Sequence, residues 1–296
     1  MNQAVIDITD LSKFYGKTRG IEHVNLEIGE GEIFGFIGPN GAGKSTTIRI
    51  LMNLIFPTGG SARIMGMDVV RQTREIKQKT GYIPSDANAY SSMMVSEFLN
   101  YCIRFYKVPG GDKRIAGLSK LFELDLTRKI ADLSMGNRKK VSIVQSLIHS
   151  PGLLIMDEPT TGLDPLMQSV FFELLRTENQ KGMTLFFSSH ILGEVQMFCK
   201  RVAIIKEGKI IQIEDIDNLR KKQLKKVVIE FGEQISIENF SIPGTVSITS
   251  GPGNILSFLF SGSINDLVSY LSGKKVNNLI IEEPSLDEIF MHYYQI

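Results

Sequence analysis

A run of eight residues between positions 38 and 45 combines small, flexible residues with one lysine and one hydroxyl group. Its members are Gly38, Pro39, Asn40, Gly41, Ala42, Gly43, Lys44 and Ser45. Three glycines let the backbone curl until successive N–H groups point inward, where they can bind phosphate oxygens. Lys44 could then reach the β- and γ-phosphates of a nucleotide, and the Ser45 hydroxyl could ligate Mg²⁺. The residue types and spacing therefore predict a phosphate-binding loop, in preference to a turn that merely joins two elements.

The segments on either side of this loop have the order that a phosphate site requires. The apolar run Ile33–Ile37 is typical of a buried strand, and residues 46–55 have helical spacing with no breaker. The first turn of the helix adds its partial positive charge to the loop. Strand, loop and helix together predict a phosphate site at the start of the first buried helix.

A second motif pairs two carboxylates with the end of another apolar run. Residues 153–156 are continuously apolar and are followed by Asp157 and Glu158. This pattern is typical of a buried parallel strand whose C-terminal end carries chemistry. Asp157 would hold Mg²⁺ directly or through water, and Glu158 would orient or deprotonate an attacking water. Acid pairs at strand ends can also be surface residues, but the phosphate loop in the same chain favours the chemical interpretation.

Two aromatic side chains are further candidates for nucleotide contacts. His190 ends the apolar run that begins at Thr184, so it is placed to meet the γ-phosphate, although a lone histidine at a strand end is usually structural. Tyr15 lies in the first turn of the chain and could stack on a purine ring. A turn tyrosine can equally be a half-buried packing residue, and both interpretations of Tyr15 stay open.

A further helix is predicted to begin near residue 134, with Ser134 as its N-cap and Gly136 leaving the backbone accessible. Taken alone, residues 133–141 are an ordinary helix start with a solvated basic face.

The remaining pattern predicts two domains of α/β class. Residues 4–36 alternate apolar and polar positions, as an antiparallel layer with one wet face does. We expect an all-helical insertion from about 85 to 150, where residues 92–105 carry a Met and aromatic stripe that we expect to be mostly core. The composition changes near 219, so the predicted domains are 1–218 and 219–296.

The second predicted domain begins with a basic stretch, Arg220–Lys226, interpreted first as a solvated linker helix and more weakly as a ligand for anionic lipid headgroups. Strands and one helix are expected to follow, and a last helix is expected from Ser285, where the spacing matches a capping box.

The bulk properties exclude several classes of protein. With 296 residues and 43% apolar residues, the chain can bury a sizeable core, and its net charge of +1 gives no general attraction to nucleic acid. The first ten residues contain no apolar segment that would mark them for secretion, and no apolar run approaches the roughly 18 residues that span a bilayer. We therefore expect a cytosolic chain unless a partner holds it at a membrane. Cys102 and Cys199 are expected to be reduced, buried thiols.

Together these motifs resemble the ATP-binding subunit of an ABC transporter, over about residues 1–215. The residues that carry the resemblance are Gly38 to Ser45, Leu133 to Asn137, Leu153 to Glu158, Gly162 to Asp164, and His190. The closing segment, residues 283–294, is similar to that of drug-resistance exporters that pair with a separately encoded permease of the ABC-2 type. The resemblance implies an ABC-type P-loop NTPase fold with an antiparallel β layer and an inserted helical subdomain, followed here by a small C-terminal α/β domain.

In that family two ATP-binding domains clamp two nucleotides between them, and the resemblance implies a role for each matching residue. Tyr15 would stack on adenine, while Lys44, Ser45 and Thr46 hold the phosphates and Mg²⁺. Asp157 would support the metal, Glu158 would be the catalytic carboxylate, and His190 would contact the γ-phosphate. Ser134 and Gly136 would reach the γ-phosphate bound by the second subunit, and Asp164 would lie at the dimer seam.

The sequence departs from the family pattern at two places. The signature stretch usually reads Leu-Ser-Gly-Gly-Gln, whereas Met135 and Asn137 replace a glycine and the glutamine here. The family also usually has Gln or Glu after the Gly-Tyr-Ile-Pro stretch that ends at Pro84, where this chain has Ser85 followed by Asp86. Either Asp86 substitutes for that residue, or the coupling to the permease is weaker.

The resulting prediction is a Mg²⁺-dependent ATPase subunit that dimerises around ATP and powers export through a separate membrane permease. It would form a homodimer without nucleic acid, in the cytoplasm and on the inner face of the membrane. One alternative is a soluble ABC protein acting on ribosomes or DNA. Against it, the chain has one phosphate loop, no heptad run and near-neutral charge. Another is a regulatory subunit that binds ATP without hydrolysis, which Ser85 motivates.

Overall fold

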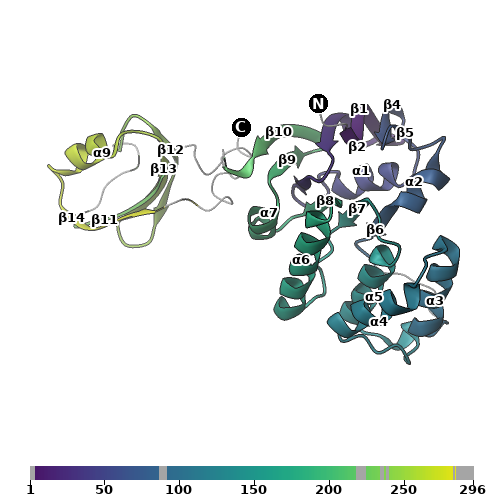
Figure 1. Ribbon diagram of the computed structural model, residues 1–296. Coiled ribbons are helices and arrows are strands. Elements are labelled where there is room, and N and C mark those ends of the chain that lie inside the picture. The colour runs from purple at the N-terminus through teal and green to yellow at the C-terminus, as the bar shows by residue number, and fades with distance from the viewer. Residues whose placement is uncertain are drawn as a thin grey trace. The chain divides into compact units, whose positions relative to one another are not determined.

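The computed structural model describes residues 4–86, 92–217, 225–233, 237, 240–282 and 284 (Figure 1). Contacts along the chain divide it into two compact units, Met1–Glu214 and Asp215–Ile296. The sequence puts the boundary after residue 218, and this limit stays a prediction.

The first unit is built on a six-stranded sheet with the strand order β10-β9-β3-β8-β7-β6. Its four central pairings, β9 with β3, β3 with β8, β8 with β7 and β7 with β6, are all parallel. Every residue of β3, β7 and β8 is buried, as expected for strands covered on both faces. The strands are β3 Ile33–Ile37, β6 Thr80–Ile83, β7 Leu153–Asp157, β8 Thr184–Ser189, β9 Arg201–Lys206 and β10 Lys209–Asp215.

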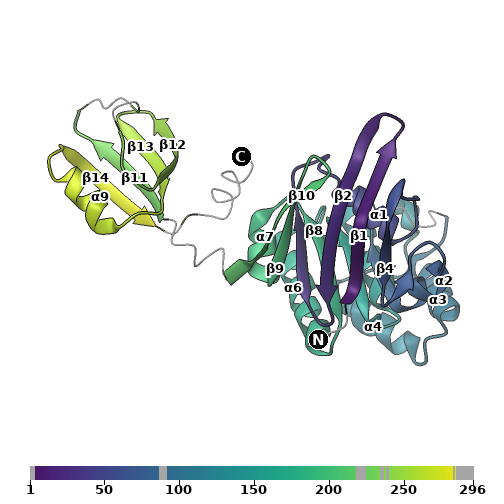
Figure 2. The ribbon, with the colours of Figure 1, turned by 90° about the horizontal axis from the view of Figure 1, so that it is seen from above.

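A second, antiparallel layer confirms the alternating pattern near the N-terminus. It has the order β2-β1-β4-β5, with β1 Ala4–Tyr15, β2 Thr18–Gly29, β4 Gly59–Ile64 and β5 Met67–Asp68. Helix α1, Lys44–Leu51, lies between this layer and the parallel sheet (Figures 1 and 2). One buried apolar cluster joins the three elements, with Leu26 from the layer, Ile48 from α1 and Phe186 from the parallel sheet. The phosphate loop is therefore attached to elements that share one buried apolar core.

Helices occupy the region between β6 and β7. They are α3 Val95–Tyr106, α4 Gly111–Leu121, the 3₁₀ helix η1 Ile130–Asp132, and α5 Met135–Leu147. The expectation that the stripe along α3 is mostly core was wrong for Met94, Tyr101 and Phe105, which are 39%, 49% and 65% exposed, and right for Phe98, which is 8% exposed. Phe98 and Leu99 supply the buried side of α3.

Further helices complete the first unit. Helix α2 covers Thr73–Lys79, α6 covers Pro165–Gln180 and α7 covers Leu192–Phe198. The last two lie on the face of the parallel sheet opposite α1 (Figure 1). Cys102 and Cys199 are free and buried, as predicted, and burial raises the pKa of the Cys102 thiol to about 11. No helix in the described part of the chain combines the length and apolar character needed to span a membrane.

The second unit is a four-stranded antiparallel sheet, ordered β12-β13-β11-β14, with helix α9. Its elements are β11 Lys225–Phe231, β12 Thr245–Gly251, β13 Ile255–Phe260, α9 Ile264–Leu271 and β14 Val276–Glu282. Leu267 and Leu271 of α9 pack with Phe258 and Phe260 in a separate core. Lys225 and Lys226 begin β11, so the predicted linker helix does not extend to them. The rest of that stretch up to Leu224, and the helix expected from Ser285, lie outside the described residues.

One histidine gives the first unit an acid-sensitive contact. The ring of His149, just after α5, stacks on Tyr106 of α3 with centroids 4.0 Å apart and an interplanar angle of 4°. Burial lowers the pKa of His149 from 6.5 to about 4. Below pH 6.5, His149 is therefore protonated in the unfolded chain while it stays neutral in the folded chain. This difference lowers the free energy of unfolding as the pH drops from 6.5 towards 4.

Replacing His149 with Phe keeps the stack but removes the titrating group. We expect the loss of unfolding free energy between pH 6.5 and 4.5 to be smaller in this variant by about 2 kcal/mol. Urea unfolding at both pH values, with wild type alongside to account for the carboxylates, measures the difference. Equal losses in the two proteins would contradict the assignment.

Candidate functional site

The predicted phosphate loop joins the end of β3 to the start of α1. Its shape depends on close backbone approaches, since a Cβ on Gly38 would collide with the carbonyl oxygen of Ile205. Gly43 has φ 110°, and a Cβ there would lie 2.8 Å from the Gly20 oxygen. Both positions require glycine, so the loop is held in one shape by its neighbours.

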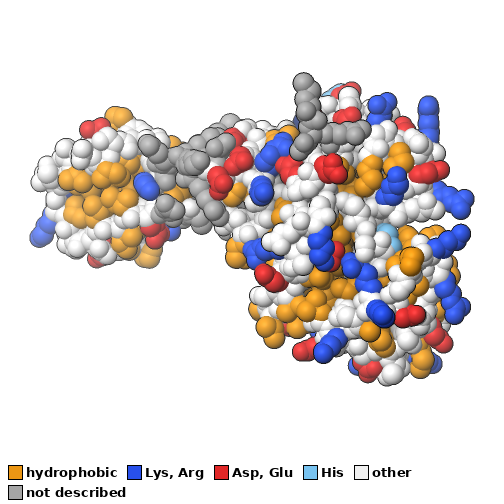
Figure 3. Space-filling view, in the orientation of Figure 1, with side chains coloured by type: hydrophobic (Ala, Val, Ile, Leu, Met, Phe, Trp, Pro, Cys, Tyr) orange, Lys and Arg blue, Asp and Glu red, His pale blue; other side chains and the backbone are white. Residues whose placement is uncertain are grey.

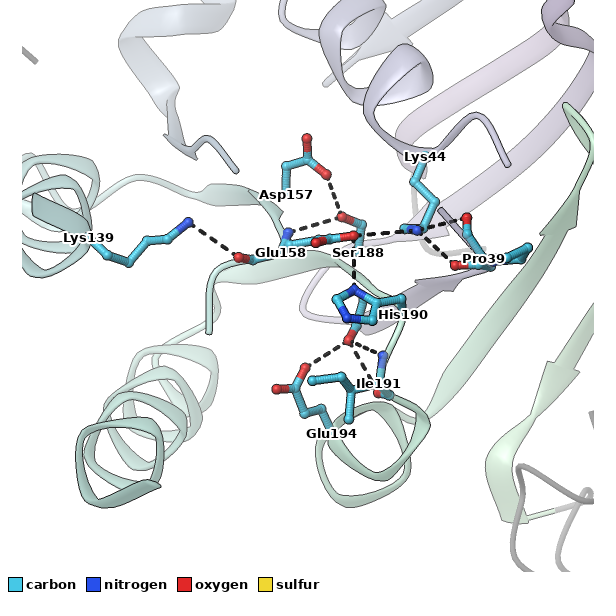
Figure 4. A network of polar contacts seen from close by, with 11 residues as sticks. Pro39, Lys44, Lys139, Asp157, Glu158, Ser188, His190, Ile191 and Glu194 are labelled. Atoms are coloured by element: carbon cyan, nitrogen blue, oxygen red, sulfur yellow. Dashed lines mark hydrogen bonds and ion pairs between the residues drawn. The ribbon is translucent and has the colours of Figure 1, made fainter. Parts of the chain in front are cut away.

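Lys44 is folded back onto the loop that precedes it. The side chain is 4% exposed, and Nζ donates to the carbonyl oxygens of Gly38 at 2.7 Å and Pro39 at 3.2 Å. The same Nζ lies 3.5 Å from Oε1 of Glu158 (Figure 4). Backbone carbonyls and one carboxylate thus hold a buried ammonium at the place where the sequence predicts phosphate oxygens.

Glu158 lies at the centre of the cluster. It follows β7 with φ 47°, and its N–H donates to the Ser188 carbonyl oxygen at 3.2 Å. Its Oε1 is 3.1 Å from Nδ1 of His190, in addition to the contact with Lys44. Two residues predicted from separate stretches of sequence, Lys44 and His190, therefore converge on the Glu158 carboxylate at the C-terminal edge of the parallel sheet.

Asp157 is the last residue of β7 and is fully buried. Its Oδ1 accepts a hydrogen bond from the Ser188 hydroxyl at 2.8 Å, whereas its buried Oδ2 has no partner in the described part of the chain. A buried carboxylate oxygen without a partner fits a cation ligand. Mg²⁺ commonly takes one or two carboxylates and completes its shell with water and substrate phosphates, so Asp157 with the half-buried Ser45 is an adequate protein contribution.

Two residues that sequence reasoning missed support the segment carrying His190. The Ser189 hydroxyl donates to Oε2 of Glu194 at 2.7 Å and accepts from the N–H of Ile191 at 2.9 Å (Figure 4). Glu194 belongs to α7 and is only 6% exposed. The signal available in the sequence was an acid, Glu194, four residues after His190. Its burial is a property of the structure.

Tyr15, expected in a turn, is the half-exposed last residue of β1, directly before the turn to β2, with Nζ of Lys13 5.3 Å from its ring centroid. A Cβ on Gly20 would lie 2.9 Å from the Tyr15 ring and 3.2 Å from the Thr46 methyl group. Tyr15 and Thr46 therefore flank Gly20, beside the start of α1. The ring is available to a ligand near the phosphate loop, and its role stays a prediction.

Ser134, Gly136 and Asp164 form a separate group. The Ser134 hydroxyl caps α5 by accepting from Asn137 N–H at 3.3 Å, and Asp164 caps α6 by accepting from Met167 N–H at 2.9 Å. A Cβ on Gly136 would lie 2.5 Å from the Gly162 oxygen, so the two helix starts touch. No hydrogen bond or ion pair described for this chain joins the group to Lys44 or Glu158.

The expectation that the basic residues at the start of α5 are solvated was wrong for two of them. Lys139 and Lys140 are 1% and 9% exposed. Nζ of Lys139 donates to the carbonyl oxygens of Pro84, Ser85 and Glu158. Lys139 stands four residues before the buried Ile143, so helical spacing already placed it on the apolar side of α5.

Comparison with known proteins identifies similar chains over most of this length. Residues 21–161 match the family model described as ABC transporter. The bacitracin transport ATP-binding protein BcrA of Bacillus licheniformis is 32% identical over 97% of this chain and 96% of its own. The ABC transporter ATP-binding protein NatA of Bacillus subtilis is 35% identical over 74% of this chain and 93% of its own.

Two solved structures are similar to more than two thirds of this chain. The structure of an ATP-binding subunit of an ABC transporter superposes with a TM-score of 0.70 at 30% identity, over 74% of this chain and 92% of its own. The dimeric ATP-binding cassette MJ0796, in a post-hydrolysis state with ADP and Pi, gives 0.66 at 26% identity, over 71% and 98%.

The geometry of the loop predicts the effect of one added methyl group. Changing Gly43 to Ala forces an L-residue to φ 110° and brings Cβ within 2.6 Å of Ile21 Cγ2. We expect ATP to bind about tenfold more weakly, because left-handed strain of about 1–2 kcal/mol must be relieved by moving the loop. Equilibrium titration with a fluorescent ATP analogue measures this. Gly117→Ala, in an open position on α4, is the matched control and should bind as wild type does. Wild-type affinity in Gly43→Ala would refute the argument.

Proposed function

The chain belongs to the ABC transporter family as an ATP-binding subunit of an export system and an ABC-type ATPase, and from this premise we propose how its residues work and what it drives. The observation that carries the proposal is the convergence of Lys44 and His190 on the Glu158 carboxylate, at 3.5 and 3.1 Å. The Lys44 ammonium can bind phosphate oxygens and the Glu158 carboxylate can act on a water molecule. The two groups are in direct contact, so both functions can serve the same nucleotide.

We assign the nucleotide to the loop and its surroundings. Lys44 exchanges its carbonyl and carboxylate partners for the β- and γ-phosphates, and the free backbone N–H groups of the phosphate loop and of the first turn of α1 bind the remaining oxygens. Tyr15 stacks on the adenine ring. His190 contacts the γ-phosphate, and Glu158, released from Lys44, orients or deprotonates the attacking water. In the absence of ATP, the ion pair with Lys44 thus keeps the Glu158 carboxylate from acting on water.

Mg²⁺ belongs to this proposal through the residues that would hold it. Oδ2 of Asp157 is buried and unpartnered in the described part of the chain, and Ser45 stands at the start of α1 beside the phosphate loop. The ion would offset negative charge on the phosphates. Ser188 holds the other oxygen of Asp157 at 2.8 Å and so fixes the direction in which Oδ2 points.

A second copy of the chain is proposed to complete each site. Ser134, Gly136 and Asp164 are grouped apart from Lys44, and large apolar side chains beside them are open to solvent: Met135 is 64% exposed and Leu166 is 68% exposed. Hydrophobic side chains also gather on the surface over α6 (Figure 3). The N-terminus of α5, with the Gly136 backbone accessible, suits a phosphate that another subunit brings. We therefore infer a homodimer in which each chain faces the phosphate loop of the other. The dimeric cassette MJ0796 supports this arrangement by similarity.

The driven partner is proposed to be a separately encoded polytopic permease of the ABC-2 type. Similarity to BcrA and NatA over most of their lengths supports an exporter subunit of this kind. The chain would then work in the cytoplasm, on the inner face of the membrane, through that permease. Closing and reopening of the ATP dimer would move the permease as a rigid body.

The role of Glu158 can be tested with an isosteric change. Glu158→Gln keeps the side-chain shape but removes the basic carboxylate, so we expect ATP hydrolysis to fall by about 100-fold or more while ATP still binds. The arrested enzyme should accumulate as an ATP-bound dimer in size-exclusion chromatography. Glu173→Gln on the exposed surface of α6 is the control. Hydrolysis at the wild-type rate in Glu158→Gln would show that the assigned role is wrong.

The partner can be tested by isolating the intact complex. The tagged full-length chain, purified from detergent-solubilised membranes, should bring with it a polytopic membrane protein in a fixed ratio to the ATP-binding dimer. Quantitative mass spectrometry of the purified sample identifies it. Recovery of ribosomes in its place would favour the alternative in which this ATPase acts on a soluble machine.

A further inference from the structure

Lys139 has an environment that ordinary surface lysines lack. It lies in the second turn of α5 and is 1% exposed. Its Nζ donates to the carbonyl oxygens of Ser85 at 2.8 Å, Pro84 at 2.9 Å and Glu158 at 3.2 Å. Three segments far apart in sequence therefore meet at one ammonium group, between α5, the end of β6 and the end of β7 (Figure 4 draws the Glu158 bond).

These contacts use the whole donor capacity of the side chain. A lysine ammonium has three N–H groups and no acceptor, and three carbonyl oxygens are in place. No donor is left for a phosphate or a water, so Lys139 is not equipped to contact ATP. Its effect on the reaction must pass through the backbone groups that it holds.

The charge of the ammonium is retained by nearby acids. Burial lowers the pKa of Lys139 to about 8, and the opposing influence of Asp157, Asp86 and Glu158 keeps it from falling further. The group is therefore mainly protonated at pH 7. A neutral apolar side chain of the same length would remove a donor from three part-buried carbonyl oxygens, and would leave the Glu158 oxygen with Thr161 N–H alone.

The Glu158 bond matters because this residue has an unusual backbone. At φ 47° it is in the left-handed region, which a non-glycine residue adopts only when its surroundings hold it there. Its N–H is fixed by the Ser188 carbonyl at 3.2 Å, and its C=O accepts from Lys139 and from Thr161 N–H. The direction of the carboxylate towards Lys44 and His190 follows from that backbone.

We propose that Lys139 is a positioning residue for ATP hydrolysis, which sets the left-handed backbone of Glu158 and ties it to the Pro84–Ser85 segment and to the start of α5. The assignment rests on the proposed function of Glu158 as the acid that handles water. It gives the 84–85 segment a connection to that acid through backbone carbonyls. The connection is independent of the side chain at position 85, where the family's usual Gln or Glu is replaced by Ser85.

The test compares variants of the full-length chain in a steady-state Mg²⁺-ATPase assay. Lys139→Met keeps the length of the side chain but donates no hydrogen bond. We expect kcat to fall about tenfold or more while KM for ATP changes less than about threefold, because the phosphate loop is untouched. Lys140→Met, the same change at the next residue, is the matched control and should keep the wild-type kcat. Lys139→Gln, with two amide donors, should recover part of the lost kcat.

Each outcome decides the question. A wild-type kcat in Lys139→Met overturns the assignment, as does a fall in kcat matched by an equal rise in KM, or a loss that Lys139→Gln does not relieve. If Lys139→Met does not fold, as judged by circular dichroism, Lys139→Gln is compared with Lys140→Gln. A selectively lower kcat at unchanged KM supports the proposal and equal values overturn it.

An inactive wild-type chain, indistinguishable from Lys44→Ala, would overturn the proposed function itself. An active wild type with an unimpaired Lys139→Met overturns this inference alone.

Discussion

One carboxylate between two cationic or ionisable groups is the contact on which the rest of the first unit depends. Oε1 of Glu158 lies 3.5 Å from the Lys44 ammonium and 3.1 Å from His190. The three residues come from the ends of different parallel strands or from the helix that follows one. Such an arrangement exists only if β3, β7 and β8 stand side by side and in register, because a shift of one residue would turn the side chains to the other face. The sheet order β3-β8-β7 provides this placement.

Buried charge is costly, and the site shows how the chain offsets that cost. Lys44, Lys139 and Asp157 are each at most 4% exposed. Both lysines donate to backbone carbonyl oxygens, and Asp157 receives the Ser188 hydroxyl on one of its two oxygens. Removing one partner from such a group leaves a desolvated charge, which destabilises far more than the intact contact stabilises. The polar atoms around the site therefore act as one network whose members are hard to replace singly.

The candidate residues fall into two groups in different parts of the first unit. Lys44, Asp157, Glu158 and His190 are assembled within one unit, around the phosphate loop. Ser134 and Gly136 stand at a different helix start, which packs against the Gly162 backbone. Capping by Ser134 and Asp164 stabilises α5 and α6 within the chain. In the homodimer that we propose, the same residues serve the partner, because caps occupy helix ends, where the backbone N–H groups also face outward.

Local sequence determined the strands, the phosphate loop and most candidate residues, because a buried parallel strand needs a continuous apolar run and a phosphate loop needs glycines at fixed spacing. The antiparallel layer that contains β1 and β2 was equally readable from the alternation of apolar and polar residues. Helical spacing put Lys139 on the apolar side of α5, against the local basic run that suggested a solvated face, but only tertiary structure decided which carbonyl oxygens its ammonium binds. Tertiary structure also decided that Tyr101 and Phe105 point to solvent, and that Ser188 and Glu194 support the site. These outcomes depend on which carbonyl oxygens and side chains of distant segments lie beside each residue. A local pattern does not encode these partners, and they are what makes the burial of a charge favourable.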